Sequence, residues 1–317
     1  MTTDSKVDYS NFFILLQAKR IHESDFSKVA RLQAMSSYSF YSLMSVNMNG
    51  KTKPDERRAL LSKIITSSGS SLVFCQELPG CFEEDVVRKC STCVYDFVRT
   101  GKEAAVMWSE AHFYGEPVDV AFKTRILDTV VASKNLFSHV SEITARTAVV
   151  KLTSKSEACS FLAVSWHGPS KMRLEKKREV LKALIPFLSE ICLKTNVSSI
   201  IIGGDFNLST SDENGLGEPN VYFPWYELSP RGKLAKERKG QGRPYIAHKD
   251  NFAITTISPS VGRPFVDMKL SKVKPLSEFN YVKEEGRERG KDILDHDPIL
   301  GVLHLGKTPS TGKFWLS

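Results

Sequence analysis

The sequence lacks long apolar runs. Near its start, the apolar stretch is only five residues long, residues 12–16, and an acid, Asp4, stands before it. The core of a signal peptide needs about 7–15 apolar residues, and a membrane-spanning helix needs about 20. We therefore expect a protein of the cytoplasm or nucleus, with no secretory signal and no membrane span.

Cysteines are few and irregularly spaced. The chain has six, and only Cys90 and Cys93, in the stretch CSTC, resemble half of a zinc site. No second half lies nearby in the sequence. This spacing argues against a disulfide framework and against a structural zinc site, so we expect reduced thiols.

Internal repeats, proline-rich linkers and low-complexity tracts are missing as well. The 317 residues are enough to bury a sizeable core, and apolar segments recur from about Ser39 to Leu305 without a break in composition. We predict one domain over residues 39–305, an N-terminal extension over residues 1–38 and a C-terminal tail over residues 306–317. For the extension, a helix and a disordered segment both stay open.

Positive charge is in moderate excess. The 44 Lys and Arg residues outnumber 36 Asp and Glu, which gives a net charge of +8 and a pI near 9.1. An excess of this size favours polyanionic partners such as nucleic acid, although many basic proteins bind none. Nothing in the sequence indicates a protein partner.

Short apolar segments alternate with amphipathic ones after residue 39. SFYSLMSVNMNG and SLVFCQEL predict strands on either side of a helix at residues 57–65. AAVMWS, TAVVKLT and FLAVSWHG predict three strands in succession, as in an antiparallel meander. Residues 173–193 predict the clearest helix, with one apolar stripe and a basic start that suits a solvated face.

Polar side chains stand where these predicted strands end. They are Asn47, Asn49, Glu77, His167, Asp205, Asn207, Asp250, Asp295 and His296. Taken alone, a stretch such as GGDFN is more often an ordinary turn. Because the strands of one sheet place their ends along a common edge, we expect the set to converge in one cleft. Carboxylates with two imidazoles are what a divalent cation and a proton transfer require.

In its order, this set of motifs resembles the endonuclease/exonuclease/phosphatase superfamily over about residues 39–305. TARTAVVKL followed by FLAVSWHGPS is most similar to the deoxyribonuclease I branch, where an Arg-containing strand precedes a strand that ends in a catalytic His. The resemblance implies an α/β fold of four layers, an α/β/β/α sandwich with two mainly antiparallel sheets flanked by helices. Three positions depart from the usual pattern, namely Val46, Asn49 and Leu294.

The same resemblance, together with the chemistry of phosphodiester hydrolysis, implies the roles of the polar residues. Glu77 would bind Mg²⁺, with Mn²⁺ as a second candidate, helped by Asp295, Asn49 and Asn47. His296, oriented by Asp250, would activate water. Asp205 and Asn207 would orient the nucleophile and hold a phosphoryl oxygen. A surface acid at Glu77 and a structural His296 are the plain alternatives.

Three further residues complete the predicted site. His167 would protonate the leaving group, and Glu103 matches the acid that supports this histidine in the deoxyribonuclease I branch. Arg146 matches a phosphate-contacting arginine, although a structural salt bridge is about as plausible.

The substrate is the least determined part of the prediction. Residues 221–245 combine aromatic and basic side chains suited to base stacking and phosphate contacts, while a surface loop anchored by its aromatics fits almost equally well. The candidate substrate-binding residues are Tyr222, Trp225, Lys236, Arg238 and Lys239. We predict a metal-dependent nuclease. A phosphoesterase for inositol phosphates, phospholipid headgroups or protein–DNA adducts is the alternative, and a catalytically silent binding module comes third.

Overall fold

The structure is a computed structural model that describes residues 38–48, 54–78, 94–134, 142–208, 221–222, 250–256, 266–276 and 297–307. Within these ranges, twelve strands form two sheets of six. The first sheet has the order β11 (Val266–Pro275), β12 (Ile299–Lys307), β1 (Tyr38–Asn47), β2 (Leu72–Gln76), β4 (Ala104–Ser109) and β3 (Tyr95–Thr100). The second has the order β5 (Phe113–Pro117), β6 (Thr147–Ser154), β7 (Ser160–His167), β8 (Ser199–Asp205), β10 (Asp250–Thr256) and β9 (Val221–Tyr222).

Most neighbouring strands run antiparallel, and each sheet contains a parallel pair. These pairs are β1 with β2 and β7 with β8. Parallel neighbours need a crossover connection, usually a helix. Helix α3 (Pro54–Ser68) connects the first pair, and helix α7 (Leu174–Thr195) connects the second. Each parallel pair therefore brings two strand ends to the same edge of its sheet.

The apolar side chains alternate along the strands and build three cores. In β8, Ile200 and Ile202 pack towards the helices, whereas Ile201 packs between the sheets. In the first sheet, Phe74 faces the space between the sheets, and Cys75 packs beneath α3. This period of two is what a strand covered on both faces requires. The sequence of layers is α3, first sheet, second sheet, then α5 (Val120–Lys134), α6 (Glu142–Arg146) and α7.

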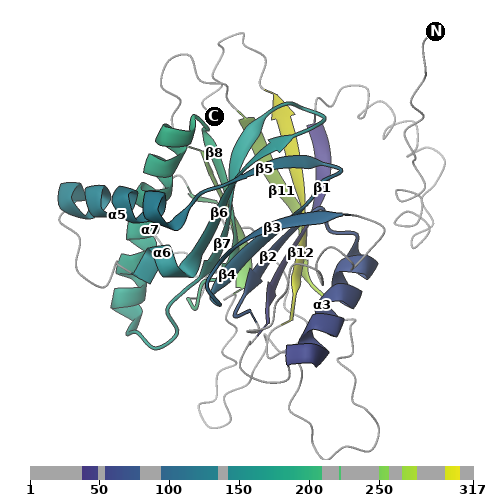
Figure 1. Ribbon diagram of the computed structural model, residues 1–317, viewed down its shortest axis with the longest axis horizontal. Coiled ribbons are helices and arrows are strands. Elements are labelled where there is room, and N and C mark those ends of the chain that lie inside the picture. The colour runs from purple at the N-terminus through teal and green to yellow at the C-terminus, as the bar shows by residue number, and fades with distance from the viewer. Residues whose placement is uncertain are drawn as a thin grey trace, which may run out of the picture. The chain divides into compact units, whose positions relative to one another are not determined.

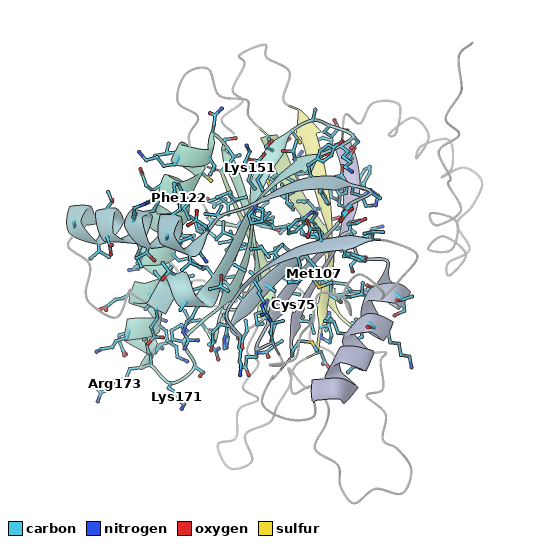
Figure 2. All side chains as sticks on the ribbon, viewed as in Figure 1. Cys75, Met107, Phe122, Lys151, Lys171 and Arg173 are labelled. Atoms are coloured by element: carbon cyan, nitrogen blue, oxygen red, sulfur yellow. The ribbon has the colours of Figure 1, made fainter. Side chains whose placement is uncertain are left out.

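Figure 1 shows these layers, with α5, α6 and α7 on the left of the two sheets and α3 on the right. In Figure 2, Cys75 of β2 and Met107 of β4 lie close together, with their sulfur atoms 3.9 Å apart. The predicted α/β/β/α sandwich is confirmed. No helix among the described residues combines the length and the apolarity that a membrane crossing requires.

Helix α7 confirms the clearest helix prediction. Its buried stripe includes Val180, Leu184, Leu188 and Ile191, spaced at three and four residues, as one face of a helix requires. Burying each large apolar side chain contributes about 1.5–3 kcal/mol relative to leaving it exposed. The helix ends at Asn196, which adopts the left-handed conformation and donates its backbone N–H to the carbonyl of Cys192.

The predicted meander of three strands is wrong. β6 and β7 are antiparallel neighbours in the second sheet, but β4 lies in the first sheet between β2 and β3. The chain passes to the second sheet between β4 and β5, and β5, α5 and α6 then precede β6. Apolar periodicity identifies a strand without telling which of two sheets it joins.

Two glycines near the end of β8 allow close packing beneath the candidate site. A Cβ atom on Gly203 would lie 2.3 Å from Cδ2 of Phe74, across the space between the sheets. A Cβ atom on Gly204 would lie 2.0 Å from the carbonyl oxygen of Trp166 in the neighbouring strand. Only glycine fits at these positions, so the GG of GGDFN serves packing while the residues after it are polar.

Candidate active site

The polar residues at the strand ends converge at one edge of the two sheets. In the second sheet, the last residues of β7 and β8, His167 and Asp205, are paired, and Asp205 is also paired with Asp250, the first residue of β10. Asn47, at the end of β1, donates from Nδ2 to Oδ2 of Asp205 at 3.1 Å. The edges of the two sheets therefore meet, and residues 158 positions apart in sequence come into contact.

His167 lies between two carboxylates. Its Nδ1 is 2.6 Å from Oε2 of Glu103, and its Nε2 is 3.3 Å from Oε1 of Glu77. The side chain of His167 is 6% exposed. Burial by itself would lower the pKa of His167, but the contact with Glu77, the charge of Asp205 and the contact with Glu103 together raise it. The site therefore favours the protonated imidazole.

The Nε2 atom of His167 has no hydrogen bond of good geometry within the described residues, although it is buried. The 3.3 Å contact with Glu77 is an ion pair whose alignment falls short of a hydrogen bond. A buried polar atom without a hydrogen bond is costly unless a ligand or water completes it. This nitrogen is consequently the one available to an oxygen atom in the cleft.

Glu103 and Arg146 form an ion-pair network around this histidine. Nη1 of Arg146 is 3.3 Å from Oε2 of Glu103, and its Nε is 2.8 Å from Oε2 of Glu142. The same Nη1 lies 3.5 Å from the carbonyl oxygen of His167. The structural salt bridge considered for Arg146 is thus present. The arginine also lines the cleft, so a phosphate contact stays a prediction.

Asp205 and Asn207 form both a turn and part of the site. Oδ1 of Asp205 accepts the backbone N–H of Asn207 at 2.8 Å, and Asn207 has the left-handed φ of 51°. Nδ2 of Asn207 donates to the carbonyl of Gly168 at 2.8 Å, which ties the turn to the segment after His167. Asp205 is 2% exposed, and its charge contributes to the raised pKa of His167. The two readings of GGDFN are compatible.

Glu77 has a strained backbone and an accessible carboxylate. Its φ of 49° is uncommon for a residue with a side chain, and conformations of this kind cluster at functional sites. The side chain is 31% exposed. Oε1 lies 3.4 Å from Nδ2 of Asn47. Its backbone N–H is fixed by the carbonyl of Glu103 at 3.1 Å.

The chemistry of the donor set fits Mg²⁺. Glu77 and Asn47 supply oxygen donors, and Mg²⁺ is usually bound by one or two carboxylates while it keeps several waters. The described residues contain no group of three His, Cys, Asp or Glu side chains that could hold a metal ion. Two other predicted ligands, Asn49 and Asp295, lie outside the described residues.

Other predicted residues are outside the described residues or away from the edge. His296, Trp225, Lys236, Arg238 and Lys239 fall outside the description. Tyr222 is 53% exposed and pairs with Ile254, four residues along β10 from Asp250. At about 3.4 Å per residue, this places it roughly 14 Å from the edge. The structure does not bring Tyr222 to the candidate site.

A cleft of about 640 Å³ opens beside His167. It is lined by Glu77, Leu78, Lys102, Glu103, Glu142, Arg146, His167, Pro169, Ser170, Lys171 and Met172. Lys102 and Lys171, which the sequence suggested only as solvated residues, both line this cleft. Lys171 and Arg173 project from the start of α7 in Figure 2. The signal that could have placed Lys171 at the site is its position four residues after His167.

Comparison with known proteins identifies the fold. No model of a known protein family matches the chain, and no curated protein matches its sequence. D. rerio TDP2 in complex with a single-stranded DNA product is 16% identical, with a TM-score of 0.54 over 84% of this chain and 99% of that one. An endonuclease/exonuclease/phosphatase family protein from Bacteroides thetaiotaomicron is 13% identical, with a TM-score of 0.59 over 84% and 98%.

A mannosyl-6-phosphatase from Bacteroides thetaiotaomicron is similar too, at 13% identity and a TM-score of 0.58, over 83% of this chain and 99% of that one. At such identities the likeness is one of fold. Both the sheet architecture and the comparisons bear out the fold that the resemblance predicted. The chain therefore has the deoxyribonuclease I-like fold.

Proposed function

We propose that this chain is a metal-dependent phosphodiesterase that hydrolyses nucleic acid in the cytoplasm or nucleus. The observation that carries the proposal is the buried His167 held between Glu103 and Glu77, at 2.6 and 3.3 Å, beside the cleft. Further support comes from the fold, from the net charge of +8 and from the single-stranded DNA product bound to D. rerio TDP2.

Hydrolysis of a phosphodiester needs an activated water, neutralised phosphoryl oxygens and a proton for the departing oxygen. Glu77 and Asn47, with Asn49 and Asp295, would hold the Mg²⁺ or Mn²⁺ ion. When bound, the ion would supply charge neutralisation. His296 with Asp250 would take the proton of the attacking water, while Asp205 and Asn207 would orient this water.

His167 has the properties of the proton donor. The contacts with Glu77, Asp205 and Glu103 raise the pKa of His167 and so favour the imidazolium form, and Glu103 fixes the ring through Nδ1. The other nitrogen, Nε2, then carries the proton at the cleft. Protonation of the leaving oxygen by a positioned group of this kind typically contributes about 10²–10⁴-fold to the rate.

A second candidate is a phosphoesterase for another phosphorylated substrate, such as an inositol phosphate, a phospholipid headgroup or a protein–DNA adduct. The observation in its favour is the cleft lining. Among the described residues, this lining has Lys102, Arg146 and Lys171 for phosphate but no Phe, Tyr or Trp ring on which a base would stack. Both candidates share the same chemistry at His167.

A substrate panel tests the proposal. The purified chain would be incubated with plasmid DNA, single-stranded DNA, RNA and a set of phosphoinositides, each with Mg²⁺ and with excess chelator. We expect hydrolysis of a nucleic acid with Mg²⁺, no hydrolysis in chelator, and loss of activity in Glu77→Gln. Cleavage of phosphoinositides alone would favour the second candidate. Binding without hydrolysis of any substrate would indicate a catalytically silent binding module. Full activity in excess chelator would refute the proposed dependence on a metal ion.

A further inference from the structure

Helix α5 carries a lysine that is buried instead of solvated. Lys123 is 1% exposed. Its Nζ donates to Oγ1 of Thr100 at 2.8 Å, to the carbonyl of Thr147 at 2.6 Å and to the carbonyl of Thr144 at 3.3 Å. These contacts use all three N–H donors of the ammonium group. Within the described residues Lys123 makes no ion pair, so uncharged oxygens alone receive its hydrogen bonds.

The acceptors of Lys123 belong to different sheets. Thr100 is the last residue of β3 in the first sheet, whereas Thr147 is the first residue of β6 in the second and directly follows Arg146. The two threonines also contact each other, because Oγ1 of Thr100 donates to the carbonyl of Thr147 at 2.7 Å. Lys123 therefore joins the helix layer to both sheets next to the candidate site.

The turn that follows Thr100 carries the carboxylates of the site. The N–H of Glu103 donates to the carbonyl of Thr100 at 3.2 Å, and the carbonyl of Glu103 accepts the N–H of Glu77 at 3.1 Å. Next to it, the carbonyl of Lys102 accepts the N–H of Leu78 at 2.7 Å. A displacement of this turn would move Glu103 directly and Glu77 through its backbone, and both contact His167.

Stability alone gives no reason for a lysine at this position. Removing an ammonium from water is costly, and neutral acceptors offset less of the cost than a carboxylate does. An apolar side chain of similar volume often stabilises such a site as well or better. The charge does, however, impose a fixed geometry on three oxygens at once.

We propose that Lys123 is a positioning residue of the candidate site, which holds Glu103 and Glu77 against His167 by fastening the turn after β3 to the start of β6. Lys123 itself lines no part of the cleft and acts through the turn. Its effect on catalysis rests on the proposed function. Its effect on the contact between His167 and Glu103 does not.

The test uses the full chain with three substitutions. Lys123→Met removes the charge and keeps the length of the side chain. Thr100→Val removes one acceptor of Lys123 and the hydrogen bond from Thr100 to Thr147, and it leaves the lysine in place. Lys151→Met removes a lysine from β6 that pairs with Glu116 and lines no part of the cleft, so it is the matched control. Circular dichroism and thermal unfolding establish that each variant folds.

The readout that does not depend on activity is the NMR chemical shift of the ring proton on Nδ1 of His167. A hydrogen bond of 2.6 Å to Glu103 should shift this proton far downfield and slow its exchange with water, in protein labelled with ¹⁵N-histidine. His167→Gln assigns the resonance. We expect Lys123→Met to move it upfield or remove it by exchange, Thr100→Val to do so in part, and Lys151→Met to leave it unchanged.

The kinetic readout uses whichever substrate the unmodified chain hydrolyses. Loss of a residue that orients a functional group typically costs about 10- to 100-fold, and we expect this loss in kcat with little change in KM. If the unmodified chain hydrolyses nothing, the proposed function fails while the resonance still decides the role of Lys123. An unchanged resonance in folded Lys123→Met would overturn the inference. If that variant does not fold, an unchanged resonance in Thr100→Val would do the same.

Discussion

The buried ammonium of Lys123 should make the free energy of unfolding rise with pH above neutrality. Burial lowers the pKa of Lys123 from 10.5 to about 8, partly opposed by the charge of Asp119. Between these values the unfolded chain binds more protons than the folded chain, so stability increases with pH in this window. Because one pKa unit corresponds to roughly 1.4 kcal/mol, the charged lysine costs the folded state about 3 kcal/mol at pH 7.

Lys123→Met removes this dependence. At pH 7 the variant gains the avoided desolvation but loses the hydrogen bonds to Thr100, Thr144 and Thr147. The hydrogen bond between Thr100 and the carbonyl of Thr147 remains available. The difference at one pH therefore mixes two effects, whereas its change with pH isolates the titration of the lysine.

Denaturant unfolding between pH 7 and pH 10.5 measures this change. The unmodified chain should gain about 3 kcal/mol relative to Lys123→Met over this range. The control Lys151→Met should follow the unmodified chain in parallel. Titration of tyrosines and other lysines cancels in the comparison. A difference between the unmodified chain and Lys123→Met that stays constant with pH would refute the assignment of a buried, charged lysine.

Four other perturbations have defined outcomes. Gly204→Ala should cost about 3 kcal/mol or more in denaturant unfolding, or prevent folding, because its Cβ would meet the backbone of the neighbouring strand at 2.0 Å. Gly69→Ala, where φ is +57° and the space is open, should cost only about 1–2 kcal/mol. The pKa of His167 is raised from 6.5. Protonated His167 therefore stabilises the folded chain fully below pH 6.5, and this stabilisation is lost as pH rises through the pKa of the folded state. Without divalent metal, His167→Gln should therefore destabilise the chain more at pH 6 than at pH 9, and an equal effect at both would contradict the raised pKa. If the segment 221–245 binds a nucleic-acid backbone, replacing Lys236, Arg238 and Lys239 by Ala should flatten the dependence of affinity on salt concentration. An unchanged slope would mean that the segment is a surface loop anchored by its aromatic residues.

Local patterns in the sequence predict the parts of the fold that depend on local physics. The apolar stripe of α7 and the strand that ends in Asp205 follow from periodicity, which burial on one or both faces imposes. Polar residues after apolar strands also indicate a site, because a sheet brings its strand ends to one edge. The order of those residues predicted the fold without an alignment.

Long-range pairing is what the sequence does not determine. The place of β4 in the first sheet depends on partners distant in sequence, and the apolar residues of β4 do not tell which sheet it joins. Glu103 meets His167 across 64 positions, and only the family resemblance, not the residues around it, indicated the contact. Lys123 gave no signal, since a lone cation in a helix is normally solvated. Tyr222 was assigned to the substrate by composition, and this role stays a prediction.

The leaving-group dependence of His167→Ala tests the central claim most directly. A nitrophenyl phosphodiester needs little protonation of its departing oxygen, whereas a sugar alkoxide needs it strongly. In a variant shown to be folded, we predict a loss of about 10²–10⁴-fold on a natural phosphodiester and a much smaller loss on the nitrophenyl ester. Equal losses on the two esters would contradict the account, because His167 would then position phosphate without donating a proton.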